Sequence, residues 1–173
     1  MQKKSSDYLI KGLLLSLVLI VVDLVGGFAH LRFETWFKWL STIITVVAII
    51  VFCIQYGKKQ LDGVTFGNVF GYGFKIALVV SILMVAYALI SFFVIFPEII
   101  DQILVRTRTD LEAKGNMTDQ QIDQAVSMTK KFMQPVPLAI VTLVITLFFN
   151  TLAALLGAAF TKKTEPNVFK DNS

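Results

Sequence analysis

The sequence predicts an all-α protein, a bundle of four transmembrane helices with a helical hairpin between the third and the fourth. Three observations lead to this fold class. Of the 173 residues, 55% are apolar and only 16% are charged, whereas a soluble domain usually carries about 25% charged residues. Four apolar runs each reach the length of about 20 residues that crosses a bilayer core. The segment between the last two runs is more polar and has apolar side chains at helical spacing.

The first span is predicted over residues 8–30, where Lys11 and Asp23 are the charged residues. Lysines ahead of an apolar run that ends in small residues also occur in cleaved signal peptides. The carboxylate at Asp23 argues against that alternative, because the core of a signal peptide is apolar.

The other three spans are predicted over residues 36–56, 72–96 and 136–160. Trp36 opens the second span and Tyr56 closes it. Tyrosine and tryptophan favour the membrane interface, because the ring is buried while its polar tip stays hydrated. These aromatic residues therefore support the predicted boundaries.

Basic residues predict that both termini face the cytoplasm, because cytoplasmic segments of membrane proteins carry an excess of lysine and arginine. With this threading, nine basic residues are cytoplasmic: Lys3, Lys4, Lys11, Lys58, Lys59, Lys75, Lys162, Lys163 and Lys170. Seven lie toward the other side: Arg32, Lys38, Arg106, Arg108, Lys114, Lys130 and Lys131.

Residues 98–135 predict two antiparallel helices outside the membrane on the non-cytoplasmic side. Thr118 and Gln121 fit a capping box, which starts a helix after the turn that contains Gly115. Two apolar stripes follow helical spacing: Ile100, Ile103, Leu104, Thr107 and Leu111, then Ile122, Ala125, Val126, Thr129, Phe132 and Met133. Charges of both signs lie outside the stripes, which indicates either a solvated face or a docking surface for a protein partner.

Four stretches have a distinctive order and spacing: "DGVTFGNVFGYGF" (62–74), "IFPEIIDQ" (95–102), "LEAKGNMTDQQIDQAVSMTKKFMQPV" (111–136) and "AAFTKK" (158–163). Together they resemble the bacterial membrane proteins grouped as domain of unknown function 4199, which occur mainly in Bacteroidota. That family is described as multi-spanning with no assigned activity. The resemblance therefore implies a multi-pass protein of the bacterial cytoplasmic (inner) membrane, and it implies no catalytic residues.

Asp23 is the main candidate for a functional residue. An ionisable side chain near the bilayer centre costs at least about 2.5 kcal/mol and should face protein or water. Matching depths predict a polar layer inside the bundle, made of Asp23, Thr45, Tyr87, Thr146 and Asn150, with His30 toward the outside.

Three interpretations of this layer are open. In the first, Asp23 is neutral, bonds Tyr87 or Thr146 and holds the bundle together, because no basic residue is expected at its depth. In the second, the layer is a proton- or cation-responsive site with His30 as the outer relay. The third interpretation places Asp23 nearer the interface.

Gly63, Gly67 and Gly71 repeat at i, i+4 spacing ahead of the third span. Small residues at this spacing let two helices approach closely, so a helix-packing role is predicted. A hinge or an interfacial re-entrant segment is the alternative.

Enzyme signatures such as HExxH, a phosphate loop or GxSxG are not found. The single cysteine, Cys53, cannot form an internal disulfide, and we expect no cofactor or metal. The net charge of +4 is spread over loops rather than clustered, so the sequence does not indicate nucleic acid binding.

We therefore expect a non-enzymatic accessory or assembly protein in the lipid bilayer, whose residues 98–135 contact a protein partner. The alternative is a small transporter or channel-like protein that uses the layer around Asp23. Four spans are few for a solitary transport path, so this alternative requires a homo-oligomer.

Overall fold

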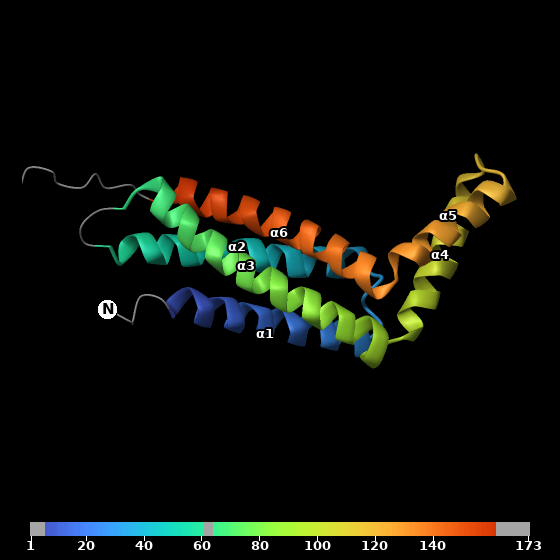
Figure 1. Cartoon of the computed structure of the whole chain (residues 1–173), viewed down its shortest axis with the longest axis horizontal. Helices are drawn as coiled ribbons and strands as arrows, with labels where there is room; N and C mark the ends of the chain where they lie inside the picture. Colours follow the sequence, from blue (N-terminus) through green and yellow to red (C-terminus); the bar gives the residue numbers. More distant parts are fainter. Residues whose placement is uncertain (1–5, 61–63, 162–173) are drawn as a thin grey trace, which may run out of the picture. The chain divides into compact units, whose positions relative to one another are not determined.

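The computed structural model describes residues 6–60 and 64–161, and this part of the chain is helical with no β-strand. The four long helices are α1 (Asp7–Phe28), α2 (Thr35–Lys58), α3 (Phe66–Ile90) and α6 (Pro135–Phe160). Between α3 and α6 lie the π-helical turn η2 (Ser91–Ile95) and the shorter helices α4 (Glu98–Lys114) and α5 (Asp119–Phe132) (Figure 1). The chain divides into two compact units, Met1–Met84 with Ile145–Ser173, and Val85–Val144.

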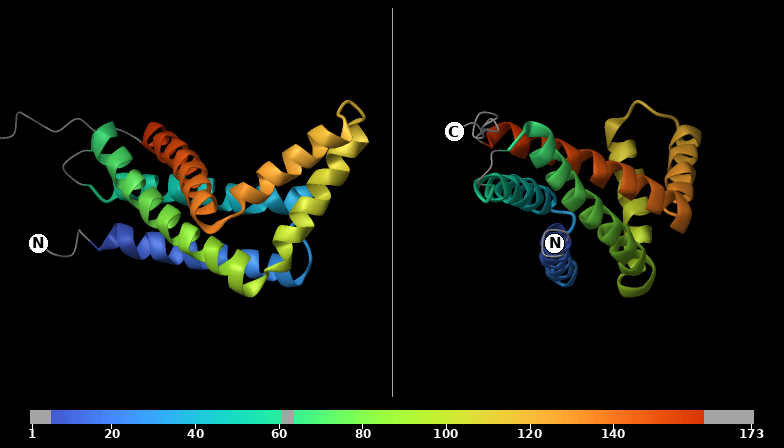
Figure 2. Two further views of the ribbon diagram at one scale, coloured as in Figure 1. Left: turned by 45° about the vertical axis from the view of Figure 1, so that its right-hand side comes forward. Right: turned by 60° about the vertical axis from the view of Figure 1, so that its left-hand side comes forward.

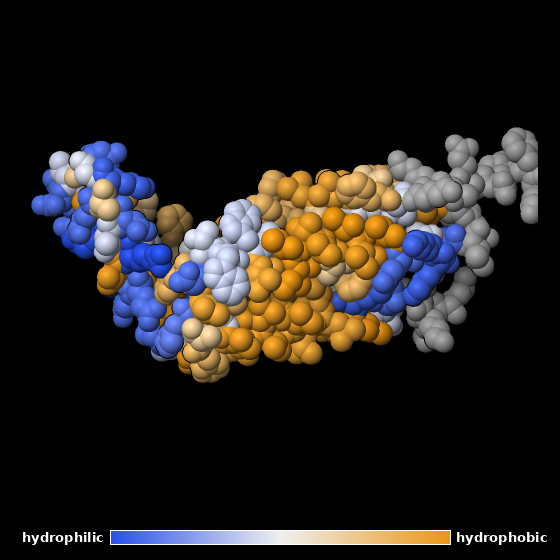
Figure 3. Space-filling view, turned by 180° about the vertical axis from the view of Figure 1, so that it is seen from behind, coloured by the Kyte–Doolittle hydropathy of each residue, from blue (hydrophilic) through white to orange (hydrophobic). Residues whose placement is uncertain are grey.

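In the described part of the chain, four helices are long and apolar enough to cross a membrane: Asp7–Phe28, Thr35–Lys58, Phe66–Ile95 and Pro135–Phe160. The shortest has 22 residues and reaches about 33 Å at a rise of 1.5 Å per residue, which exceeds the about 30 Å of a bilayer core. Their outward faces carry exposed Leu, Ile, Val and Phe side chains, which form the broad apolar surface of Figure 3. The predicted all-α class with four spans is therefore confirmed, and the protein is an integral membrane protein.

Helix α3 begins at Phe66, ahead of the predicted boundary at residue 72. The backbone N–H of Asn68 donates to Thr65 Oγ1 at 3.3 Å, so the threonine hydroxyl satisfies a donor that the first helical turn leaves free. A ladder of neighbouring rings then runs along the first turns, formed by Phe66, Phe70 and Phe74. Aromatic contacts at i, i+4 spacing support the helix in a segment whose glycines lower helix propensity.

The glycines of the predicted packing row do not mark a helix contact within the described residues. A Cβ atom at Gly71 would have no neighbour within 4 Å, and one at Gly67 would meet only the Thr65 hydroxyl at 4.0 Å. Gly63 lies outside the described residues. Within residues 6–60 and 64–161, no other helix therefore comes close to Gly67 or Gly71.

Close helix packing occurs instead at Gly73 and Gly157. A Cβ at Gly73 would lie 2.6 Å from Cys53 Sγ and 2.9 Å from Ala154 Cβ. A Cβ at Gly157 would lie 2.7 Å from Cys53 Cβ and 3.2 Å from Ile50 Cα. Small residues allow α2, α3 and α6 to pack closely here, as is common between membrane helices. Larger buried side chains extend this core: Leu15, Leu19, Ile49, Val69, Tyr72, Ile76 and Val80.

Helices α4 and α5 pair as a hairpin inside the unit Val85–Val144 (Figure 2). Gly115 ends α4 with φ 65°, a left-handed conformation that glycine adopts without a steric cost. The predicted capping box at the start of α5 is confirmed. Thr118 Oγ1 accepts from the N–H of Gln121, and Gln121 Oε1 accepts from the N–H of Thr118 at 2.9 Å.

Candidate functional site

Asp23, the carboxylate inside the first apolar run, forms an ion pair. Arg32, on the connection between α1 and α2, donates from Nη2 to Asp23 Oδ2. The exposed fraction is 12% for the Arg32 side chain and 32% for the Asp23 side chain. The expectation that no basic residue lies at the depth of Asp23 is therefore wrong. The argument for a neutral Asp23 carboxyl bonded to Tyr87 or Thr146 depended on that expectation, so it no longer applies.

A tight reversal at the end of α1 brings Arg32 back to Asp23. The N–H of Leu31 donates to the Gly26 carbonyl at 2.8 Å, and the N–H of His30 donates to the Gly27 carbonyl at 3.2 Å. His30 has φ 57°, so the pair of bonds is the Schellman motif that ends many helices. His30 thus occupies the position that reverses the chain, with an exposed side chain.

Asp23 lies in the C-terminal part of α1. Asp23 lies five residues before the end of α1 at Phe28, or about 7.5 Å along the helix axis. The guanidinium of Arg32 can therefore reach it from the connecting segment. The sequence signal for this contact was Arg32 itself, a long basic side chain a few residues beyond the span.

Part of the predicted polar layer surrounds one cavity. Thr45, Thr146 and Asn150 line a cavity of about 450 Å³ in the unit that contains α1 and α2, whereas Asp23 and His30 are not among its lining residues. Tyr87 belongs to the unit Val85–Val144. Three of the six predicted residues therefore line one cavity.

A buried serine that the sequence analysis missed supports this polar region. Asn150 Nδ2 donates to Ser81 Oγ at 3.1 Å, and Ser81 is fully buried in α3. Thr45 Oγ1 donates to the Ser41 carbonyl at 2.7 Å within α2. A small polar residue in the middle of a long apolar run was the signal for Ser81, because an unpaired hydroxyl in lipid is costly.

A second polar cluster, also missed, lies near the start of α1. Tyr72 donates its hydroxyl to Asp7, and Lys11 Nζ lies 3.4 Å from Asp7 Oδ2. The ammonium of Lys11 also lies 5.1 Å from the centroid of the Phe52 ring and 5.2 Å from that of Tyr72. Tyr56 stacks on Tyr72 with centroids 4.1 Å apart. The carboxylate and the ring faces compensate the burial of this cation, which joins α1 to α2 and α3.

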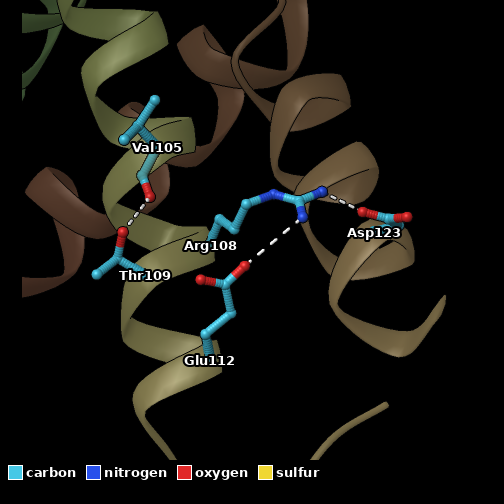
Figure 4. A network of polar contacts seen from close by, with 5 residues as sticks. All are labelled: Val105, Arg108, Thr109, Glu112 and Asp123. Atoms are coloured by element: carbon cyan, nitrogen blue, oxygen red, sulfur yellow. Dashed lines mark hydrogen bonds and ion pairs between the residues drawn. The ribbon is translucent and has the colours of Figure 1, made fainter. Parts of the chain in front are cut away.

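Arg108 connects the two helices of the hairpin (Figure 4). Its Nη2 donates to Asp123 on α5, and its Nη1 lies 3.6 Å from Glu112 Oε1 on α4. All three side chains are exposed, and such surface pairs contribute at most about 1 kcal/mol each. The network therefore helps to orient α4 relative to α5 but contributes little to the stability of the hairpin.

Three apolar side chains on the hairpin remain exposed: Val105 at 67%, Met128 at 55% and Phe132 at 51%. Phe132 was predicted within the second apolar stripe, and it is the last residue of α5. Ile122, from the same stripe, is buried at 3%.

Within residues 6–60 and 64–161, no group of three or more His, Cys, Asp or Glu side chains could hold a metal ion.

A comparison with protein-family models matches residues 9–163 to a family described as "Protein of unknown function (DUF4199)". Searches of curated proteins and of solved structures find no match. The match covers the four spanning helices and the hairpin almost completely.

Proposed function

The chain belongs to the DUF4199 family of proteins of unknown function, and we propose that it is a non-enzymatic accessory or assembly protein whose α4–α5 hairpin binds a protein partner. One observation carries this proposal. Helices α4 and α5 contact each other, and the hairpin still exposes Val105, Met128 and Phe132.

The internal contacts of the hairpin matter because a preformed surface loses little entropy on binding. Gly115 ends α4, the capping box at Thr118 starts α5, and the Arg108–Asp123 pair joins the two helices. Exposed apolar side chains among charges of both signs are typical of a small recognition surface, in which apolar anchors supply affinity and charges supply specificity.

We further propose that the protein resides in a bacterial inner membrane with both termini in the cytoplasm and the hairpin on the opposite side. The excess of lysines near the two termini and between α2 and α3 supports this orientation. The hairpin would then meet partners outside the cytoplasm.

A cysteine placed at Asn116, at the exposed tip of the hairpin, is expected to react with a membrane-impermeant maleimide in intact spheroplasts. A matched cysteine at Lys58, at the end of α2, should react only after the membrane is opened. Cys53 is fully buried, and a Cys53→Ser background removes it as a source of signal. Labelling of Lys58→Cys but not of Asn116→Cys in intact spheroplasts would contradict the orientation.

A photo-crosslinking amino acid at Gln124, an exposed position on α5, is expected to give a discrete adduct with one protein in living cells. The Met128→Glu substitution on the same helix should lower the yield about tenfold, since it replaces a buried apolar contact of the complex by a charge that must be desolvated. The crosslinker at Ile82, an exposed apolar position on the spanning helix α3, serves as control and should give lipid adducts only.

The partner proposal would be contradicted if Gln124 gave no protein adduct, or if its adducts were as numerous and diffuse as those of a random surface position. An adduct unaffected by Met128→Glu would also contradict it, because the exposed apolar residues would then not take part in binding.

The transport alternative has less support. It needs Asp23 as a titrating group in a shared polar layer, but Asp23 pairs with Arg32 and is not among the residues that line the cavity. The cavity that remains lies mainly among apolar side chains, which favours a ligand other than an ion.

A further inference from the structure

The cavity between the spanning helices has the size of a ligand site. Its volume of about 450 Å³ falls within the roughly 300–1,000 Å³ that is usual for small-molecule sites. All four spanning helices contribute to its wall, and every lining residue belongs to one compact unit. Its lining residues include Leu19, Trp39, Thr42, Thr45, Val80 and Phe149.

Two of the polar side chains around this cavity form hydrogen bonds within the protein. The hydroxyl of Thr45 donates to the Ser41 carbonyl, and the amide of Asn150 donates to Ser81. A buried water needs two to four polar partners, and the exposed wall of the cavity is almost entirely apolar. The cavity therefore suits hydrocarbon better than water or ions.

The position of the cavity indicates where such hydrocarbon comes from. Leu19 and Val80 lie near the middle of their spans, whereas Trp39 lies in the second turn of α2. The cavity thus extends from the middle of the helices toward one end, where tryptophan side chains meet lipid headgroups. It is partly open, and the surroundings of spanning helices are acyl chains.

We infer that this cavity binds one acyl chain of a membrane phospholipid as a specific ligand, with the headgroup near Trp39. Burial of the methylene groups against Leu19, Val80 and Phe149 supplies the affinity. The inference is independent of the partner proposed for the hairpin, since it concerns a different unit of the chain.

The test measures phospholipid retained by the purified full-length protein, with native mass spectrometry after extensive detergent washing. The wild type is expected to keep one phospholipid per chain. Thr45→Phe and Thr42→Phe, which each place a ring into the cavity, should weaken binding about tenfold, because they displace about two methylene groups of the chain. Val47→Phe, on the same helix but at a 54% exposed position, should leave retention unchanged.

A second measurement applies even if both cavity-filling variants fail to fold. A phospholipid with a photoactivatable acyl chain, incorporated in vesicles with the wild-type protein, should label the lining residues Thr45, Val46 and Asn150 in preference to the exposed Ile43 and Phe148. The inference is overturned if labelling follows exposure alone, or if the washed wild type retains no lipid. It is also overturned if Thr45→Phe and Val47→Phe retain equal amounts, or if the retained molecule is an isoprenoid rather than a phospholipid.

Discussion

Replacing Gly157 by leucine is expected to lower the free energy of unfolding by about 3 kcal/mol, at the upper end of the cost of overpacking a core. A Cβ atom alone would lie 2.7 Å from Cys53 Cβ, 2.9 Å from Cys53 Sγ and 3.2 Å from Ile50 Cα. The last contact involves backbone, so α2 and α6 must move apart to relieve it. The measurement is equilibrium unfolding in mixed micelles, with thermal denaturation as a second readout.

Gly71→Leu is the matched control, because it introduces the same side chain into a helix at a position with no neighbour within 4 Å. Its effect should stay within about 0.5 kcal/mol, as for most surface substitutions. Equal losses for the two variants would contradict the packing described above and would indicate that the predicted row of Gly67 and Gly71 makes a helix contact after all.

Breaking the Asp23–Arg32 pair is expected to cost about 2 kcal/mol for each single substitution, Asp23→Asn or Arg32→Gln. Removing one partner of a fully buried pair costs about 3–5 kcal/mol, and the 32% exposure of Asp23 reduces that cost. The double variant should lose clearly less than the sum of the two single losses, since neither charge is then left without its partner.

The same unfolding assay measures this double-mutant cycle. Glu34→Gln is the control for charge removal on the connecting segment, because Glu34 is exposed, and it should have little effect. Additive losses of unfolding free energy from the two single variants, or a silent Asp23→Asn, would contradict the ion pair.

Local features of the fold could be predicted because they depend on residues close together in the chain. The capping box needs only Thr118 and Gln121 at the right spacing, and the structure contains it. The spans follow from mean hydropathy over one helix length, so four were found with boundaries close to those of the helices. The largest difference lies at the start of α3, where neighbouring aromatic rings and the Thr65 hydroxyl support a helix that contains several glycines.

The candidate site was less predictable, because it depends on which side of each helix packs against another helix. Depth matching placed Thr45, Thr146 and Asn150 at similar levels, and these three do line one cavity. The same reasoning placed Asp23 with them, but it could not anticipate that the chain reverses at His30 and returns Arg32 to the carboxylate.

Composition and short-range pattern thus predicted that lipid surrounds most of the chain, how many times the chain crosses it, and where the connecting segments lie. Each of these follows from the transfer of apolar side chains into lipid, a free energy that sums residue by residue along the chain. Only the tertiary structure showed that other helices pack closely at Gly73 and Gly157 rather than at Gly67 and Gly71. It also showed that Asn150 forms a hydrogen bond with Ser81. Lipid and the surface of a second helix are similarly apolar. Hydropathy therefore does not distinguish a helix face that contacts lipid from a helix face that packs against another helix.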